Sequence, residues 1–203
     1  IYDKKRPVPF AEYVPDRDFW YQLAPDLIGL ITWDYSFGTA DGIFELGENR
    51  LGALICFEIA IDDIGRELVA DEAELILSQT NNADFGRTDE SFQQAALARL
   101  RAIETGRAVV NISTVGLSVV YLPNGQIVDQ VPTFEPAHMV IDVPLRNSLT
   151  PAMIVGNRFD LAINFAALVL FVLALRERSR RLNRSHEASD SEPQALTVSS
   201  KES

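Results

Sequence analysis

The chain has 203 residues, 47% of them hydrophobic and 23% charged, which suits one medium-sized domain with a buried core. Its formal net charge of −11 at pH 7 repels phosphate backbones, so no nucleic-acid partner is predicted. The one cysteine cannot form an internal disulfide, and the two histidines, His138 and His186, lie far apart in the sequence. We therefore expect neither a metal nor a cofactor.

The first 150 residues predict a globular domain in which strands and helices are mixed. The chain opens at "IYDKKRPVPF" with no initiator methionine and no signal-peptide pattern, and we expect it to be the C-terminal piece of a longer protein.

Short apolar runs predict six strands. "LGALICFE" (51–58) is an apolar strand that runs into a helix start, and "AELILSQTNN" (73–82) is a second buried strand. "AVVNIST" (108–114) is a third, and "LSVVYLPNGQIVDQ" (117–130) predicts two strands around a Pro-Asn-Gly turn. A final strand is predicted at "AHMVIDVPL" (137–145). This order predicts an α/β layered domain with a mixed sheet.

The clearest helix is predicted over 88–107. Thr88 can cap its start and Gly106 sits where a C-terminal cap belongs. Arg99 and Arg101 on this helix are expected to form surface ion pairs, with lipid-headgroup binding as the alternative. The apolar residues that follow helical spacing, and are expected to face the core, are Phe92, Ala95, Ala96, Leu100 and Ile103.

The C-terminal quarter predicts a membrane anchor. Residues 151–158 are a connector, and 159–175 are apolar around the whole circumference of a helix, which favours a transmembrane helix over a buried core helix. Residues 176–203 are expected to be a disordered cytoplasmic tail, which places the domain on the other side of the membrane. Five arginines support this orientation: Arg176, Arg178, Arg180, Arg181 and Arg184.

Cys56 decides the functional interpretation. A lone cysteine after an apolar strand can be an inert core thiol or a nucleophile. At a strand-to-helix junction, unpaired backbone N–H groups favour the thiolate and can receive an oxyanion. Glu58, two residues on, holds a carboxylate close by.

A second group of residues favours catalysis. The pattern "Y-x-K-x-x-x-V-P-F-x-E" over residues 2–12, followed about 45 residues later by "ICFE", resembles the carbon–nitrogen hydrolase (nitrilase) superfamily. Further along come "QTNNADFG", "ARLRAIETGRAVVNISTVG", "LPNGQI" and "VPLRNSLTPAMIVGN", in that order. With an apolar helix after them, these motifs resemble the apolipoprotein N-acyltransferase family. Their residues are most similar to those of its actinobacterial members. The resemblance implies the C-terminal part of a nitrilase-like α-β-β-α sandwich followed by one transmembrane helix.

The resemblance also implies a role for each matched residue. Cys56 is the nucleophile that takes an acyl chain from a phospholipid as a thioester. Lys4 stabilises the tetrahedral oxyanion together with the backbone N–H of Phe57. Glu12 orients Lys4 or the base, and Glu58 shapes the site. The acyl group then passes to the α-amine of a diacylglyceryl-modified cysteine on a lipoprotein, by the two-step logic of covalent catalysis.

Simpler structural roles compete with these assignments. Glu12 can be a capping or surface carboxylate, and Glu58 can simply favour the positive end of a helix. The family's general-base glutamate lies before the lysine segment, so no residue here is assigned to it, and the isolated chain is expected to be inactive. Phe57 stands where many members carry tyrosine, and Asp84 stands where an aromatic residue is frequent.

Two other functions stay open at this point. One is a membrane-tethered amidase of the nitrilase type, which differs only in using water as the acyl acceptor. The other is a catalytically inactive, membrane-anchored interaction module. The resemblance itself implies a cell-membrane enzyme, multi-pass in the complete protein, with its catalytic domain outside the cytoplasm.

Overall fold

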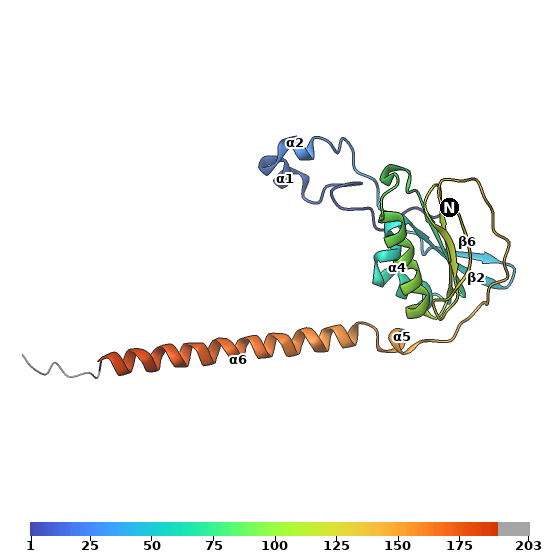
Figure 1. Ribbon diagram of the computed structural model, residues 1–203. Helices are drawn as coiled ribbons and strands as arrows, with labels where there is room; N and C mark the ends of the chain where they lie inside the picture. Colours follow the sequence, from blue (N-terminus) through green and yellow to red (C-terminus); the bar gives the residue numbers. More distant parts are fainter. Residues whose placement is uncertain (191–203) are drawn as a thin grey trace, which may run out of the picture. The chain divides into compact units, whose positions relative to one another are not determined.

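The computed structural model describes the backbone of residues 1–190, with side chains as far as residue 178. The chain divides into two compact units, of which the first is Ile1–Ile154 and the second begins at Val155. Figure 1 shows the course of the chain in each.

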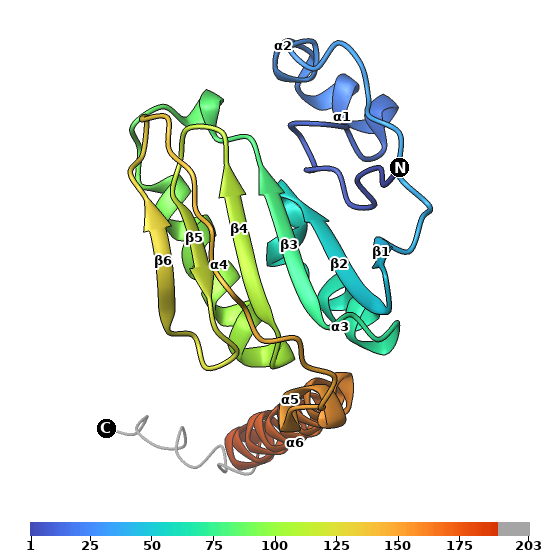
Figure 2. The ribbon, with the colours of Figure 1, turned by 90° about the vertical axis from the view of Figure 1, so that its right-hand side faces the viewer.

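A six-stranded mixed sheet forms the centre of the first unit (Figure 2). Its strands lie side by side in sequence order. The second, third and fourth strands run parallel, and the remaining neighbouring pairs are antiparallel. The strands are β1 (Ile43–Leu46), β2 (Asn49–Ile55), β3 (Leu75–Thr80), β4 (Ala108–Ser113), β5 (Ser118–Tyr121) and β6 (Ile127–Val131).

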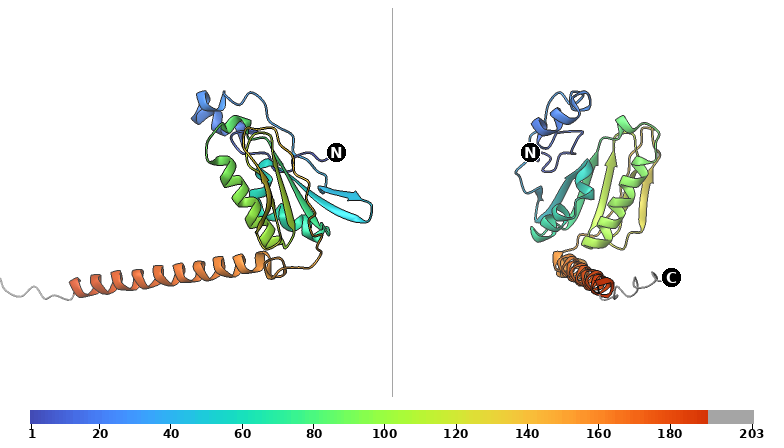
Figure 3. Two further views of the ribbon diagram at one scale, coloured as in Figure 1. Left: turned by 45° about the vertical axis from the view of Figure 1, so that its right-hand side comes forward. Right: turned by 90° about the vertical axis from the view of Figure 1, so that its left-hand side faces the viewer.

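Two helices, α3 (Asp62–Ala70) and α4 (Glu90–Thr105), connect the parallel strands and cover the same face of the sheet (Figures 2 and 3). Parallel neighbours require such crossovers, and crossovers of one handedness place both helices on one side. The hydrophobic core lies between these helices and the sheet. Its buried members are Leu54, Ile59, Ile64, Leu68, Ala73, Ile76, Ala95, Ala98, Ala102, Val109, Val119 and Tyr121.

Four of the predicted strand segments are confirmed. They form strands because each is an apolar run that a packed sheet can bury on one or both faces. The Pro-Asn-Gly turn between β5 and β6 is present as predicted. Gly125 adopts φ +80° there, a conformation that glycine takes without steric cost, and its N–H donates to the carbonyl of Leu122 at 2.8 Å.

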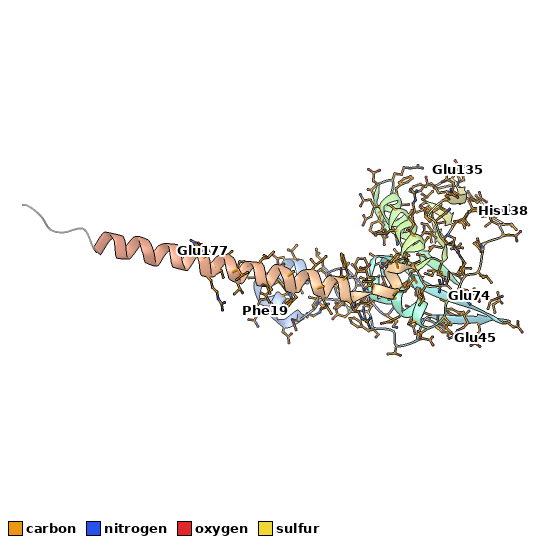
Figure 4. All side chains as sticks on the ribbon, turned by 90° about the horizontal axis from the view of Figure 1, so that it is seen from below. Phe19, Glu45, Glu74, Glu135, His138 and Glu177 are labelled. Carbon is orange, nitrogen blue, oxygen red and sulfur yellow. The ribbon has the colours of Figure 1, made fainter. Side chains whose placement is uncertain are left out.

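The predicted strand at 137–145 is wrong, because these residues form no strand. Prolines at 132, 136 and 144 remove backbone donors in and around the segment, which disfavours a sheet ladder. The chain crosses the face of the sheet opposite α4 instead (Figure 2). With Val110 and Val120 it lines an open cavity of about 550 Å³. Glu135 and His138, which Figure 4 labels, are also among the lining residues.

Of the five residues expected to face the core from α4, only Ala95 is buried, and Ala96 is exposed. The helix packs on the sheet through small side chains, Ala95, Ala98 and Ala102, whereas Phe92, Leu100 and Ile103 are exposed. Alanines allow the close approach of helix and sheet that larger side chains would prevent.

The predicted ends of α4 are only partly right. Gly106 takes φ +67° and caps the helix as predicted, its N–H donating to the carbonyl of Ala102. The helix begins at Glu90, after Asp89, and neither Asp89 nor Thr88 provides a side-chain cap.

Residues 1–42, which the sequence assigned to no particular element, lie beside the carboxyl ends of β2 and β3 (Figure 2). They contain two short helices, α1 (Arg17–Leu23) and α2 (Pro25–Ile28). Arg17 pairs with Asp34 at 2.6 Å and donates to the carbonyl of Ile31, which closes the segment on itself.

The second unit is mainly one helix, α6 (Asn157–Asp190), preceded in the chain by α5 (Pro151–Val155). The 22 residues Asn157–Arg178 are long and apolar enough, by length and composition, to cross a membrane. The helix continues beyond 175 to Asp190, where a disordered tail was predicted. Arginine, glutamate and leucine are good helix formers, which explains the extension. The remainder of the predicted tail, 191–203, lies outside the described residues.

Candidate functional site

Cys56 directly follows the carboxyl end of β2, in a tight turn rather than at the start of a long helix. The turn η1 (Cys56–Ala60) is a five-residue 3₁₀ helix, and α3 begins only at Asp62. The sequence prediction of a strand running straight into a helix is therefore corrected in this detail. Cys56 is a free, partly exposed cysteine. In open α/β sheets ligands bind beyond the carboxyl ends of parallel strands, which is where this sulfur lies.

The backbone at Cys56 is strained. Its φ is +54°, in the left-handed region that a side chain other than glycine adopts at a cost of about 1–3 kcal/mol. Such a conformation persists only where neighbouring contacts hold it, so the contacts of the turn are central to the site.

Glu58 provides the first of these contacts from inside the turn. It is fully buried, and one carboxylate oxygen accepts a 2.8 Å hydrogen bond from the backbone N–H of Ile55. The same oxygen accepts from the hydroxyl of Tyr2 at 2.9 Å. The other oxygen accepts from the backbone N–H groups of Lys5 at 2.6 Å and Arg6 at 3.1 Å. One carboxylate thus joins the N-terminal segment to the turn that carries the cysteine.

The environment of Glu58 also perturbs Tyr2. Burial, followed by the nearby carboxylate of Glu58, raises the pKa of the Tyr2 phenol above its ordinary value. Tyr2 therefore stays protonated at neutral pH and remains a hydrogen-bond donor to Glu58.

Lys4 and Glu12 form a close ion pair in the N-terminal segment. The ammonium of Lys4 lies 2.8 Å and 2.7 Å from the two carboxylate oxygens of Glu12, and the Lys4 side chain is only 10% exposed. The backbone N–H of Val8 also donates to Glu12 at 2.7 Å. Charge-assisted bonds to both oxygens fix the direction of a side chain that would otherwise be mobile. Glu12 is not at a helix terminus, which argues against its alternative role as a helix cap.

The sequence-predicted residues thus form two linked groups. Lys4 and Glu12 contact each other, and the neighbours of Lys4 are bound to Glu58, two residues from Cys56. The predicted oxyanion role of the Phe57 N–H remains a prediction. No group of three or more possible metal-ligating residues occurs among the described residues.

The cavity on the opposite face of the sheet is separate from the residues of the candidate site. Its lining comes from β4, β5, the residues between them, and the chain from the end of β6 onward, and includes none of Cys56, Lys4, Glu12 or Glu58. His138 lies there and is therefore not a partner for the cysteine in this structure.

Two residues of this region were not identified from the sequence as functional. Tyr2 was quoted only as part of a motif, although its aromatic ring close to the lysine was a usable signal. Arg101 was predicted at the surface, but it is 3% exposed and contacts the carbonyl of Ile59 in η1. Because that contact spans 42 positions, no local pattern could reveal it.

Comparison of the sequence with known proteins identifies the family to which the chain is similar. A family model described as carbon-nitrogen hydrolase matches residues 1–148. An apolipoprotein N-acyltransferase of Mycolicibacterium smegmatis is 31% identical over 181 residues, which cover 88% of this chain and 30% of that protein. One from Vibrio parahaemolyticus is 34% identical over 158 residues, covering 77% of this chain and 31% of that protein. The chain spans about a third of the length of these curated relatives.

Solved structures agree on the fold. An amidase from Nesterenkonia sp. superposes with a TM-score of 0.54 at 21% identity, covering 81% of this chain and 55% of that protein. A cysteine-to-alanine mutant of an amidase from Nesterenkonia AN1, described as a member of the nitrilase superfamily, gives a TM-score of 0.51 at 22% identity, covering 65% of this chain and 50% of that one. The predicted nitrilase-like α/β fold is therefore confirmed.

Proposed function

Because the chain belongs to the carbon–nitrogen hydrolase family, we propose that it carries the nucleophile half of an apolipoprotein N-acyltransferase site. The acyl donor is a phospholipid and the acceptor is the α-amine of a diacylglyceryl-cysteine on a lipoprotein. The observation that carries the proposal is the Glu58 carboxylate, which binds the segment of Lys4 and the turn of Cys56 together.

In the first half-reaction, the sulfur of Cys56 attacks the ester carbonyl of the phospholipid as its proton leaves to a base. The Lys4 ammonium and the backbone N–H of Phe57 stabilise the oxyanion of the tetrahedral intermediate. The carbon–oxygen bond then breaks, the lysophospholipid leaves as an alcohol that takes up a proton, and a thioester remains on Cys56.

In the second half-reaction, the lipoprotein amine attacks the thioester. The carbon–sulfur bond breaks, an amide forms, and the amine's proton is passed on so that the Cys56 thiol is restored. Glu12 acts on Lys4, because its two hydrogen bonds direct the ammonium. No residue of this chain is assigned as the proton-accepting base, and we expect the isolated 203-residue chain not to turn over.

Two features favour a lipid donor over the small amide of an amidase. The first is the apolar stretch Asn157–Arg178, which supports anchoring in a cell membrane. The arginines after it favour a cytoplasmic C-terminus and a catalytic domain on the other side. The second is a set of exposed apolar side chains after Glu12, in the same segment as Lys4; exposed apolar surface marks sites of contact with a membrane or another protein. They include Phe19, Tyr21, Leu23, Leu27, Leu30 and Trp33.

The test is N-acylation of a diacylglyceryl-lipoprotein in cells that depend on the complete polypeptide. Cys56→Ser should abolish acylation while the protein still accumulates in the membrane. The isosteric exchange Ser78→Cys, which places a second thiol in the buried core, should leave acylation intact. Normal acylation by Cys56→Ser would refute the proposal and favour the inactive interaction module.

A further inference from the structure

Arg101 binds the turn η1, which carries Cys56, from a neighbouring helix. It lies on α4 with its side chain almost fully buried. Its Nη2 and Nε donate to the backbone carbonyl of Ile59 at 3.2 Å and 3.4 Å. Its charge is balanced by Asp62, at 2.8 Å, and by Glu104, one turn further along α4.

The two hydrogen bonds of Arg101 reach the turn η1, which carries Cys56. Ile59 is the fourth residue of η1, and Cys56, with its positive φ, is the first. A carbonyl near the C-terminal end of a helical turn has a free lone pair, which a guanidinium fork can satisfy. Glu58 holds the turn at its N-terminal side through Ile55, and Arg101 holds it at its C-terminal side. The strained cysteine lies between these two attachments.

The neighbouring helix leaves room for this side chain. Gly65 of α3 lies against Arg101, and a Cβ at that position would be 2.8 Å from Cδ and 3.1 Å from Nε of the arginine. Gly65 has an ordinary backbone conformation, so the absence of a side chain is required by the arginine and not by φ. An alanine there would displace the guanidinium from the Ile59 carbonyl without removing its charge.

We propose that Arg101 is a positioning residue for Cys56, acting through the Ile59 carbonyl to keep η1 in the conformation that presents the sulfur. This rests on the proposed function, since it assigns Cys56 as the reacting atom. Arg101 touches neither acyl donor nor acceptor. A shift of about 1 Å at a reacting group can cost about 100-fold in rate, so loss of the contact should lower kcat rather than raise KM.

The experiment compares variants of the complete polypeptide: Gly65→Ala, Arg101→Met, Arg101→Lys and the control Arg99→Met. Arg99 is exposed on the same helix and donates to Gly125 in the β5–β6 turn. Acyl transfer, the rate of Cys56 alkylation by iodoacetamide and the unfolding midpoint are measured for each. Alanine is the better helix former, so Gly65→Ala should keep α3 intact.

The expected result is that Gly65→Ala and Arg101→Met lower kcat about 10- to 100-fold with KM changed less than about twofold. Arg101→Lys, which keeps one donor near the carbonyl, should fall between them and the wild type, and Arg99→Met should match the wild type. The rate of alkylation should follow kcat. If Arg101→Met does not fold, Gly65→Ala decides the question.

Folded Gly65→Ala protein with wild-type kcat and wild-type alkylation would overturn the positioning role. If the wild type itself forms no acyl-enzyme, the proposed function fails, but the alkylation rate of Gly65→Ala still supports or overturns the positioning of the sulfur by Arg101.

Discussion

Replacing Glu58 by glutamine tests the contact between the N-terminal segment that carries Lys4 and the turn that carries Cys56. The carboxylate is fully buried and accepts four hydrogen bonds, two on each oxygen. The amide keeps one oxygen for two donors and turns an NH₂ group toward the other two. The Tyr2 hydroxyl can rotate and accept from that NH₂, but the backbone N–H of Ile55 then has no acceptor.

The cost follows from this count. Losing the charge of an acceptor and leaving one buried N–H unpaired amounts to about 2–4 kcal/mol, from values of about 1–3 kcal/mol for each such group. This is a large part of the about 5–15 kcal/mol that stabilises a domain. Urea unfolding of the chain measures it. Glu67→Gln is the control, because Glu67 pairs with Lys5 at a half-exposed position and should cost less than about 1 kcal/mol. Equal stability of Glu58→Gln and the wild type would refute this view of the contact.

Three further outcomes are expected. Burial raises the pKa of Tyr2, so its contribution to stability is present below pH about 10 and is lost as pH rises further; Tyr2→Phe should flatten that alkaline loss in urea titrations at increasing pH. Gly106→Ala should be more destabilising than Gly47→Ala, because both have positive φ but only Gly106 has a methyl group 2.8 Å from a new Cβ; equal unfolding midpoints would contradict this. Lys4→Met should lower acyl transfer at least about 100-fold and Lys5→Met much less, and similar rates would argue against Lys4 at the oxyanion.

The strands and the main helix could be predicted from the sequence because their signals are local. The apolar runs at β2, β3 and β4 and the glycine at 106 carry information within a few residues. The segment 137–145 misled because its alternating apolar residues suit a strand, whereas most of its side chains, such as Val140, are exposed and only some of its residues line the cavity on the open face of the sheet.

The contacts that organise the site could not be found in this way. Glu58 binds backbone N–H groups 52 and 53 positions earlier, and any residue type could supply them. The exposed apolar residues of α4 follow helical spacing as well as its buried alanines do, so periodicity alone identified only Ala95 of the buried face. The burial of Arg101 depends on the absence of a side chain at Gly65, a matter of tertiary packing.

The mass of the adduct trapped on Cys56 tests the central claim most directly. The complete polypeptide is mixed with phospholipid, quenched in acid without an acceptor, digested and analysed by mass spectrometry. A thioester of a fatty acid on the peptide that contains Cys56, discharged by a lipoprotein amine, is the predicted result. An unmodified thiol, or an adduct formed only with small amides, would contradict the account.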